Sequence, residues 1–245
     1  MQWFENEEFW SLLYPRLFRD RHFEAAPEEV DRVLALSGVH QGAALDLCCG
    51  PARHSVSLAN KGFRVTGVDR SPFLLNKARE RAAGADIEFV QCDAREFVRE
   101  RAFDLAISLY TSFGYFETRE EDMRVLKNVR GNLKPGGVFV IDVMGREVVA
   151  SKPCHTLWEE FPDGSIFVEH NQTLPGWTRI RLHWLLVQQD RAHRFDFELS
   201  IYSGQELKEA LEQAGFSDVQ IFGSLAGTPY DGNAARLVAR AVVVD

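Results

Sequence analysis

The sequence predicts a doubly wound α/β fold with a mostly parallel sheet, on three observations. Residues 43–49 are apolar except for Asp46, as expected of a strand that is buried on both faces of a parallel sheet. Gly50 then permits a sharp backbone turn, and residues 64–69 give a second strand. Three runs between residues 165 and 202 are joined too closely for parallel crossovers, so they predict a small antiparallel insertion.

The second strand ends in an acid, Asp69, which lies 19 positions after Gly50. Dinucleotide-binding folds place a carboxylate at about this spacing to bind ribose hydroxyls, so Asp69 is predicted to hold a ribose. A dinucleotide fingerprint has glycine at three positions of the turn, which here are Gly50, Ala52 and Ser55. Pro51 also removes an amide donor for phosphate. The turn therefore favours a nucleoside without phosphates, such as S-adenosylmethionine, over a nicotinamide dinucleotide.

Four motifs of the chain, taken in order, resemble those of class I S-adenosylmethionine-dependent methyltransferases. They are ALDLCCGPARHS with GVD (44–55 and 67–69), QCDA (91–94), FDLAISLY (103–110) and LKPGGVFVID (133–142). Ala52 stands where many members carry glycine. The resemblance implies a Rossmann-like sheet of seven strands, in which residues 217–222 and 237–243 form an antiparallel last pair. It also implies an antiparallel strand insertion after the fifth strand.

The resemblance implies that the cofactor S-adenosyl-L-methionine binds where the strands of the sheet end. Asp46 is expected to order the first turn or to receive the methionine ammonium, and the loop at Asp93 to meet the adenine. The full set of expected cofactor-binding residues is Tyr14, Asp46, Cys48, Gly50, Arg53, His54, Asp69, Arg70, Asp93, Ala94 and Leu109.

The methyl acceptor should meet the loop that follows Ser108, because ligands of this fold lie at the carboxyl ends of the strands. This loop lacks the Asn-Pro-Pro-Tyr type of motif, which argues against nucleobase or glutamine acceptors. It resembles the loop of small-molecule N-methyltransferases, including aminosugar dimethyltransferases and, more distantly, glycine N-methyltransferase. We expect Tyr110, Ser112 and His183 to position a small-molecule acceptor, with nitrogen favoured over oxygen.

The insertion offers further candidates, but strand alternation separates them. Arg179, Arg181 and His183 share one face of a strand, while Leu182 and Trp184 share the other. The polar face is either solvated or binds an anion of the acceptor. His170 and Tyr202 are candidates of the same kind.

Composition restricts the partners. The chain has 245 residues and a formal net charge of −8, which opposes non-specific nucleic acid binding. Its four cysteines, Cys48, Cys49, Cys92 and Cys154, show no zinc-ligand spacing, so we expect reduced thiols and no metal. The acidic N-terminus does not have the pattern of a secretion signal, and no apolar run is long enough for a membrane span. A cytoplasmic protein is expected.

The chain is expected to form a single methyltransferase domain over residues 1–245. Residues 1–37 are predicted to form a helical lid, with one helix starting at Pro27, and residues 151–202 an insertion over the active-site mouth. Helix starts are also predicted at Ser71, Thr118 and Ser203, where an N-cap oxygen precedes proline or a capping-box acid.

Two other functions share parts of this pattern. A nicotinamide-dependent oxidoreductase has the same strand, turn and acid, although the altered glycines and Pro51 speak against it. A noncatalytic S-adenosylmethionine-binding protein would retain the fold without methyl transfer. The sequence decides neither the acceptor, nor its reacting atom, nor the use of a general base, nor the oligomeric state.

Overall fold

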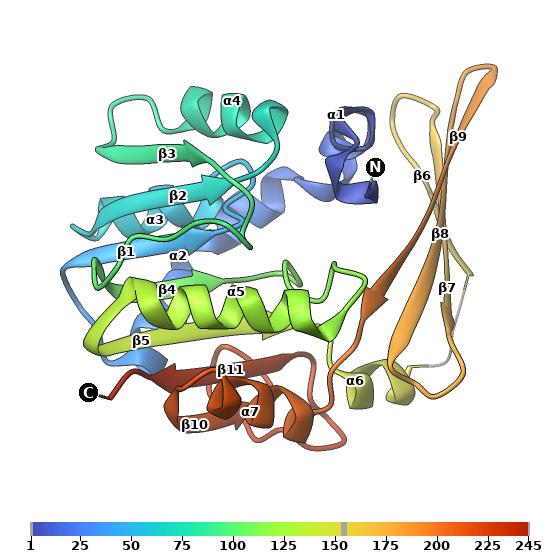
Figure 1. The fold of residues 1–245 in the computed structure, drawn as a ribbon. Helices are drawn as coiled ribbons and strands as arrows, with labels where there is room; N and C mark the ends of the chain where they lie inside the picture. Colours follow the sequence, from blue (N-terminus) through green and yellow to red (C-terminus); the bar gives the residue numbers. More distant parts are fainter. Residues whose placement is uncertain (1, 153–155, 245) are drawn as a thin grey trace.

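A computed structural model describes residues 2–152 and 156–244 of the chain. Its main sheet has seven strands in the order β10-β11-β5-β4-β1-β2-β3 (Figure 1). Strands β1 to β5 are parallel to one another, whereas β11 is antiparallel to both β5 and β10. This confirms the predicted fold class. The strands are β1 Ala43–Leu47, β2 Arg64–Asp69, β3 Ile87–Gln91, β4 Phe103–Ser108, β5 Leu133–Val143, β10 Ser217–Phe222 and β11 Leu237–Val242.

Helices cover both faces of this sheet. On one face α2 (Asp20–Ser37) and α3 (Arg53–Asn60) bury Val33 and Leu58 against strand residues such as Leu105. On the other face α5 (Arg119–Asn132) and α7 (Gly204–Gln213) bury Leu126 and Leu211. Helix α4 (Pro72–Arg81) contacts β2 and β3 at the end of the sheet. The central strands of the sheet are therefore buried on both faces, which explains the nearly continuous apolar run of β1.

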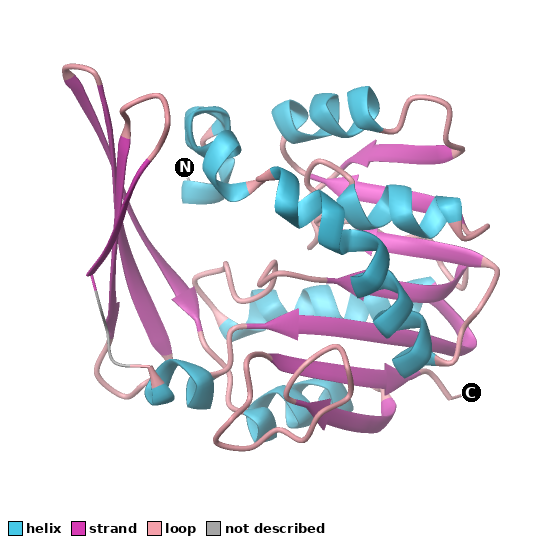
Figure 2. Cartoon of the chain, turned by 180° about the vertical axis from the view of Figure 1, so that it is seen from behind, coloured by secondary structure: helices cyan, strands magenta, loops and turns pink. Residues whose placement is uncertain are grey.

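A second, antiparallel sheet has the order β6-β7-β8-β9 and stands beside the main sheet (Figure 1). Its strands are β6 Thr156–Glu160, β7 Ile166–Thr173, β8 Arg179–Gln188 and β9 Arg191–Ser200, and α6 (Arg146–Ser151) precedes it. The N-terminal elements η1 (Trp3–Glu5) and α1 (Glu7–Leu17) lie between the two sheets (Figure 2). Phe9 and Leu13 of α1 are buried against the apolar side chains of β8 and β9.

Two local expectations were wrong. Helix α2 begins at Asp20 rather than at Pro27, which lies inside it. Burial of Ala26, Val30 and Val33 on the same helix compensates for the hydrogen bond that proline cannot make. Strand β6 was not expected, because all five of its residues are exposed and show no alternating apolar pattern.

The helix starts predicted at Ser71, Thr118 and Ser203 are confirmed by their hydrogen bonds. The Ser71 hydroxyl accepts a bond from Leu74 N, and Thr118 and Ser203 form capping boxes with Glu121 and Glu206. Cys48, Cys49 and Cys92 are free thiols, and Cys154 lies outside the described residues. In the described part of the chain, no helix is long and apolar enough to span a bilayer.

Candidate functional site

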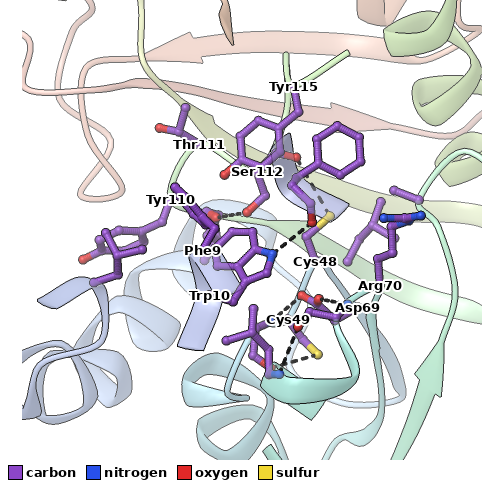
Figure 3. Close-up of a pocket in the computed structure, with 18 of the residues that line it drawn as sticks. Phe9, Trp10, Cys48, Cys49, Asp69, Arg70, Tyr110, Thr111, Ser112 and Tyr115 are labelled. Carbon is purple, nitrogen blue, oxygen red and sulfur yellow. Dashed lines mark hydrogen bonds between the residues drawn. The ribbon is translucent and has the colours of Figure 1, made fainter. Parts of the chain in front are cut away.

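A cavity of about 340 Å³ lies where the carboxyl ends of β1, β2 and β4 face the N-terminal segment and the second sheet (Figure 3). Most of the residues that the sequence predicted to bind the cofactor or the acceptor line this cavity. These are Asp46, Cys48, Gly50, Arg53, His54, Asp69, Arg70, Asp93, Ala94, Leu109, Tyr110 and Ser112.

Asp69 is held beside the first turn by backbone amides. Gly50 N donates to one carboxylate oxygen at 2.8 Å, and Ser71 N donates to the other at 2.9 Å. Burial raises the pKa of Asp69 to about 6, although these two hydrogen bonds oppose the shift. The carboxylate is therefore fixed in direction and keeps lone pairs for a ligand hydroxyl.

The turn after β1 has a compact backbone. Cys48, Gly50 and Ala52 all have positive φ values, of 60°, 53° and 64° respectively. Asp46 stabilises the turn from below, because its carboxylate accepts a hydrogen bond from the Ser55 hydroxyl of α3 at 2.5 Å. Burial raises the pKa of Asp46 above its ordinary value. Of the two roles expected for Asp46, this contact favours ordering of the turn over binding of the methionine ammonium.

Arg53, His54 and Tyr110 form a polar cluster at one side of the cavity. The Arg53 guanidinium lies 3.5 Å from the centroid of the Tyr110 ring. The Tyr110 hydroxyl donates to Glu29, and His54 Nε2 lies 2.8 Å from the other oxygen of the same carboxylate. Tyr110 and Thr111 both adopt left-handed backbone conformations, at φ 60° and 61°. The loop after β4 is therefore held in a strained conformation at the cavity.

Asp93 and Arg70 lie at the far side of the cavity, after β3 and β2. Arg95 donates to both oxygens of Asp93, at 2.9 and 2.8 Å, and Arg70 bonds Glu5 at 2.9 Å. Burial alone would raise the pKa of Asp93, but the hydrogen bonds from Arg95 hold this pKa below its ordinary value. Asp93 is thus engaged within the protein, and the adjoining Ala94 also lines the cavity.

Two of the expected site residues do not line the cavity. The Tyr14 ring instead packs on Phe18 and Phe73, with centroids 5.3 and 5.7 Å apart. His183 points from the opposite face of the second sheet, where its Nδ1 lies 2.5 Å from Asp196. This placement gives no support to the expected acceptor-positioning role of His183, since strand alternation turns the side chain away from the cavity.

The other polar candidates of the insertion do not line the cavity either. Arg179 and Arg181 both pair with Glu198 on the outer face, at 3.2 and 2.7 Å. His170 stacks on His183 on the same face, with ring centroids 6.0 Å apart. The Tyr202 hydroxyl donates to buried Asp122 at 2.6 Å. These contacts favour the first alternative, a solvated polar face, over an anion site.

Sequence reasoning missed the opposite wall of the cavity. We call this surface the aromatic wall: it consists of Trp3, Phe9, Trp10, Tyr115, Trp184 and Phe197. Its rings contact one another, and Trp3 stacks on Phe197 with centroids 4.3 Å apart. The sequence placed both the N-terminal lid and the insertion near the site, but it did not show that the rings of the two segments would contact one another.

The comparisons with known proteins agree with this geometry. Residues 44–137, from β1 into β5, match the family model described as a methyltransferase domain. The chain is an S-adenosylmethionine-dependent methyltransferase. The enzyme is 28% identical over 216 residues to the putative methyltransferase YqeM of Bacillus subtilis (strain 168), which covers 82% of this chain and 84% of YqeM.

Two further similarities extend over most of the enzyme. It is 23% identical over 231 residues to dTDP-3-amino-3,6-dideoxy-alpha-D-glucopyranose N,N-dimethyltransferase of Streptomyces fradiae, covering 87% of this chain and 84% of that protein. Its fold is similar to that of an S-adenosylmethionine-dependent methyltransferase from Clostridium acetobutylicum ATCC 824. That structure gives a TM-score of 0.79 at 16% identity, covering 97% of this chain and 98% of the other.

No metal centre is evident in the part of the enzyme that the structure describes. Within residues 2–152 and 156–244, three or more His, Cys, Asp or Glu side chains nowhere gather in a way that could hold an ion.

Proposed function

We propose that the enzyme moves a methyl group from S-adenosylmethionine to the nitrogen of a small-molecule amine. The observation that carries the proposal is the Asp69 carboxylate, fixed by Gly50 N and Ser71 N at the edge of a cavity that continues to the aromatic wall. The cavity volume of about 340 Å³ is within the usual range of small-molecule sites. The S. fradiae relative, named for N,N-dimethylation of an amino sugar, supports nitrogen as the reacting atom.

The chain's own residues divide the work of holding the cofactor. Asp69 accepts hydrogen bonds from the ribose hydroxyls, and Ala94 beside Asp93 meets the adenine. The turn at Gly50, with Arg53 and Leu109, faces the amino-acid tail. When bound, S-adenosylmethionine would supply an electrophilic methyl group on its sulfonium. An amine nitrogen would attack the methyl carbon in line, and the sulfur would leave with the carbon–sulfur electron pair as S-adenosylhomocysteine.

Catalysis then rests mainly on orientation and exclusion of water. Tyr110 and Ser112, on the loop after β4, border the region where the acceptor enters. The Ser112 hydroxyl donates to Leu109 O at 3.0 Å, so its proton is already used in a hydrogen bond within the loop. A neutral amine needs no dedicated base for attack, and the methylated product releases its extra proton to water.

The proposal is tested by calorimetric titration of the enzyme with S-adenosylhomocysteine. Replacement of Asp69 by Ala should cost about 1.5–3 kcal/mol of binding free energy, because charge-assisted hydrogen bonds to the ribose are lost. Asp190→Ala, in the exposed turn between β8 and β9, is the matched control and should bind like the wild type. Absence of binding at millimolar ligand, or equal affinity for Asp69→Ala, would contradict the proposal.

A further inference from the structure

One carboxylate lines the cavity beside the aromatic wall. Glu169 of β7 lines the same cavity. In the pairing of β7 with β8, Glu169 lies directly opposite Trp184. Because paired residues of neighbouring strands point to the same face, Glu169 and Trp184 are presented together to the cavity. A carboxylate therefore stands among rings on the side of the cavity away from Asp69.

Glu169 is held in position but has no cationic partner among the described residues. Asn171, two positions along the same strand face, donates its Nδ2 to Glu169 Oε1 at 2.7 Å. The Asn171 Oδ1 atom is itself buried without a hydrogen-bond partner. The side chain of Glu169 is half-buried, and an anion in such a place is costly unless a positive or hydrogen-bonding group meets it.

The aromatic rings around Glu169 also favour a positively charged group. Trp184 stacks on Phe9 with centroids 5.8 Å apart and meets Phe197 edge-on at 5.0 Å. Aromatic faces attract cations through their quadrupole, most strongly when water is excluded. Carboxylate and rings together form a surface complementary to an amine on an apolar body.

The same surface is unsuited to phosphate. The N-terminal elements and the second sheet contribute several of the described residues that line the cavity. Among these, Glu169 is the single charged residue. The arginines of the cavity lie on the cofactor side, where Arg53 covers Tyr110 and Arg70 bonds Glu5. Recognition of a diphosphate needs cationic donors such as a bidentate arginine, and a carboxylate repels it.

We propose that the acceptor is an apolar amine without phosphate, and that Glu169 binds its amino group against the aromatic wall. This inference rests on the proposed N-methyltransferase function and separates this enzyme from its S. fradiae relative, whose name specifies a dTDP-linked sugar. Before the transfer, the bound ammonium loses one proton to water, which leaves a lone pair on nitrogen. The carbon–nitrogen bond then forms as the carbon–sulfur bond breaks, and positive charge passes from sulfur to nitrogen. Glu169 and the rings stabilise that charge before the proton leaves to water.

The test is calorimetry on the full-length enzyme saturated with S-adenosylhomocysteine. The probes are tryptamine, phenethylamine and cyclohexylamine as apolar amines, indole-3-propionate as the carboxylate counterpart of tryptamine, and a dTDP-linked amino sugar. At least one amine should bind, and tryptamine should bind about tenfold or more tightly than indole-3-propionate. Glu169→Gln should weaken amine binding by about ten- to a hundredfold, because a charge-assisted bond is lost.

The matched control is Glu160→Gln, at an exposed position of β6 that does not line the cavity, and it should leave amine binding unchanged. Both variants should bind S-adenosylhomocysteine like the wild type, which also shows that they fold. The inference is overturned if no amine binds the saturated wild-type enzyme, if the dTDP-sugar or the carboxylate binds better, or if Glu169→Gln is silent. Failure of S-adenosylhomocysteine itself to bind would instead contradict the proposed function.

Discussion

At the scale of single residues, pH can separate the structural role of Asp69 from the ribose-binding role that we propose for it. Burial raises its pKa to about 6, so the folded protein binds this proton more tightly than the unfolded chain does. The contribution of Asp69 to stability is therefore present at low pH and declines as the pH rises through about 6. Ribose binding has the opposite dependence, since the ionised carboxylate is the stronger hydrogen-bond acceptor.

We predict that the affinity for S-adenosylhomocysteine falls as the pH is lowered through about 6, by at most about tenfold per pH unit. Asp69→Asn should bind more weakly than the wild type and show a flat profile over this range, because the titrating group is gone. Calorimetry at several pH values between about 5 and 8 measures both curves. Parallel slopes for the two proteins would assign the pH dependence to another group.

Gly114 is a second residue whose identity the structure requires. Its φ is +89°, and a Cβ placed there would lie 2.5 Å from Ser200 O of β9. The same two residues are joined by a hydrogen bond from Ser200 N to Gly114 O at 2.7 Å. Gly114 therefore attaches the loop after β4 to the second sheet at a distance that only glycine allows.

Gly114→Ala is expected to lower the free energy of unfolding by about 1–3 kcal/mol, since it adds both backbone strain and a steric clash. Gly131→Ala is the matched control, because Gly131 lies in α5 and a Cβ added to it would meet no atom within 4 Å. That change should instead stabilise by about 0.5–1 kcal/mol. Urea unfolding of the three proteins measures both effects, and a neutral Gly114→Ala would show that the loop can shift away from β9.

At the scale of elements, the starts of helices were predictable because their signals are local. Ser203 illustrates this: its hydroxyl accepts from Glu206 N at 3.1 Å, and its own N donates to Glu206 Oε2 at 2.9 Å. Both bonds follow from two residues three positions apart, without reference to the rest of the molecule. Strand β1 was similarly readable, since its burial on both faces leaves a run that is apolar except for Asp46.

Ser203→Ala should therefore cost about 1 kcal/mol of unfolding free energy, the usual loss when an N-cap hydroxyl is removed. Gln213→Ala, at the exposed C-terminal end of the same helix α7, is the control and should change stability by less than about 0.5 kcal/mol. Thermal unfolding followed by circular dichroism compares them. Equal melting temperatures for Ser203→Ala and the wild type would mean that water replaces the cap.

The elements that could not be predicted depend on distant partners. Strand β6 consists of exposed residues and exists because β7 offers it a hydrogen-bonding edge. Alternation divided β8 correctly into a polar and an apolar face, but which face would meet the cavity depended on where α1 packs. For this reason the sequence did not show that His183 lies on the face away from the cavity, or that Glu169 lines the cavity.

At the scale of the whole molecule, the cavity is enclosed by three parts of the chain that meet only after folding. The main sheet supplies the side proposed for the cofactor. The aromatic wall comes from η1, α1 and the second sheet, together with Tyr115 of the loop after β4. Arg16 of α1 links the last two: it is 5% exposed, it donates to Ser165, and it lies 3.5 Å from Asp163 in the turn between β6 and β7. Its guanidinium also lies 4.8 Å from the Phe161 ring centroid.

Replacement of Arg16 by Met should therefore loosen the aromatic wall while leaving the cofactor side intact. Methionine retains much of the apolar stem, so the change removes chiefly the hydrogen bonds and the contact with Phe161, at a cost of about 1–3 kcal/mol of unfolding free energy. Amine binding should weaken more than binding of S-adenosylhomocysteine, because Trp3, Phe9 and Trp10 are carried by the same segment as Arg16. Arg32→Met removes an exposed ion pair with Glu28 on α2 and should cost less than about 0.5 kcal/mol. Equal losses for the two ligands, measured by calorimetry, would show that the N-terminal segment supports the whole cavity rather than its acceptor side.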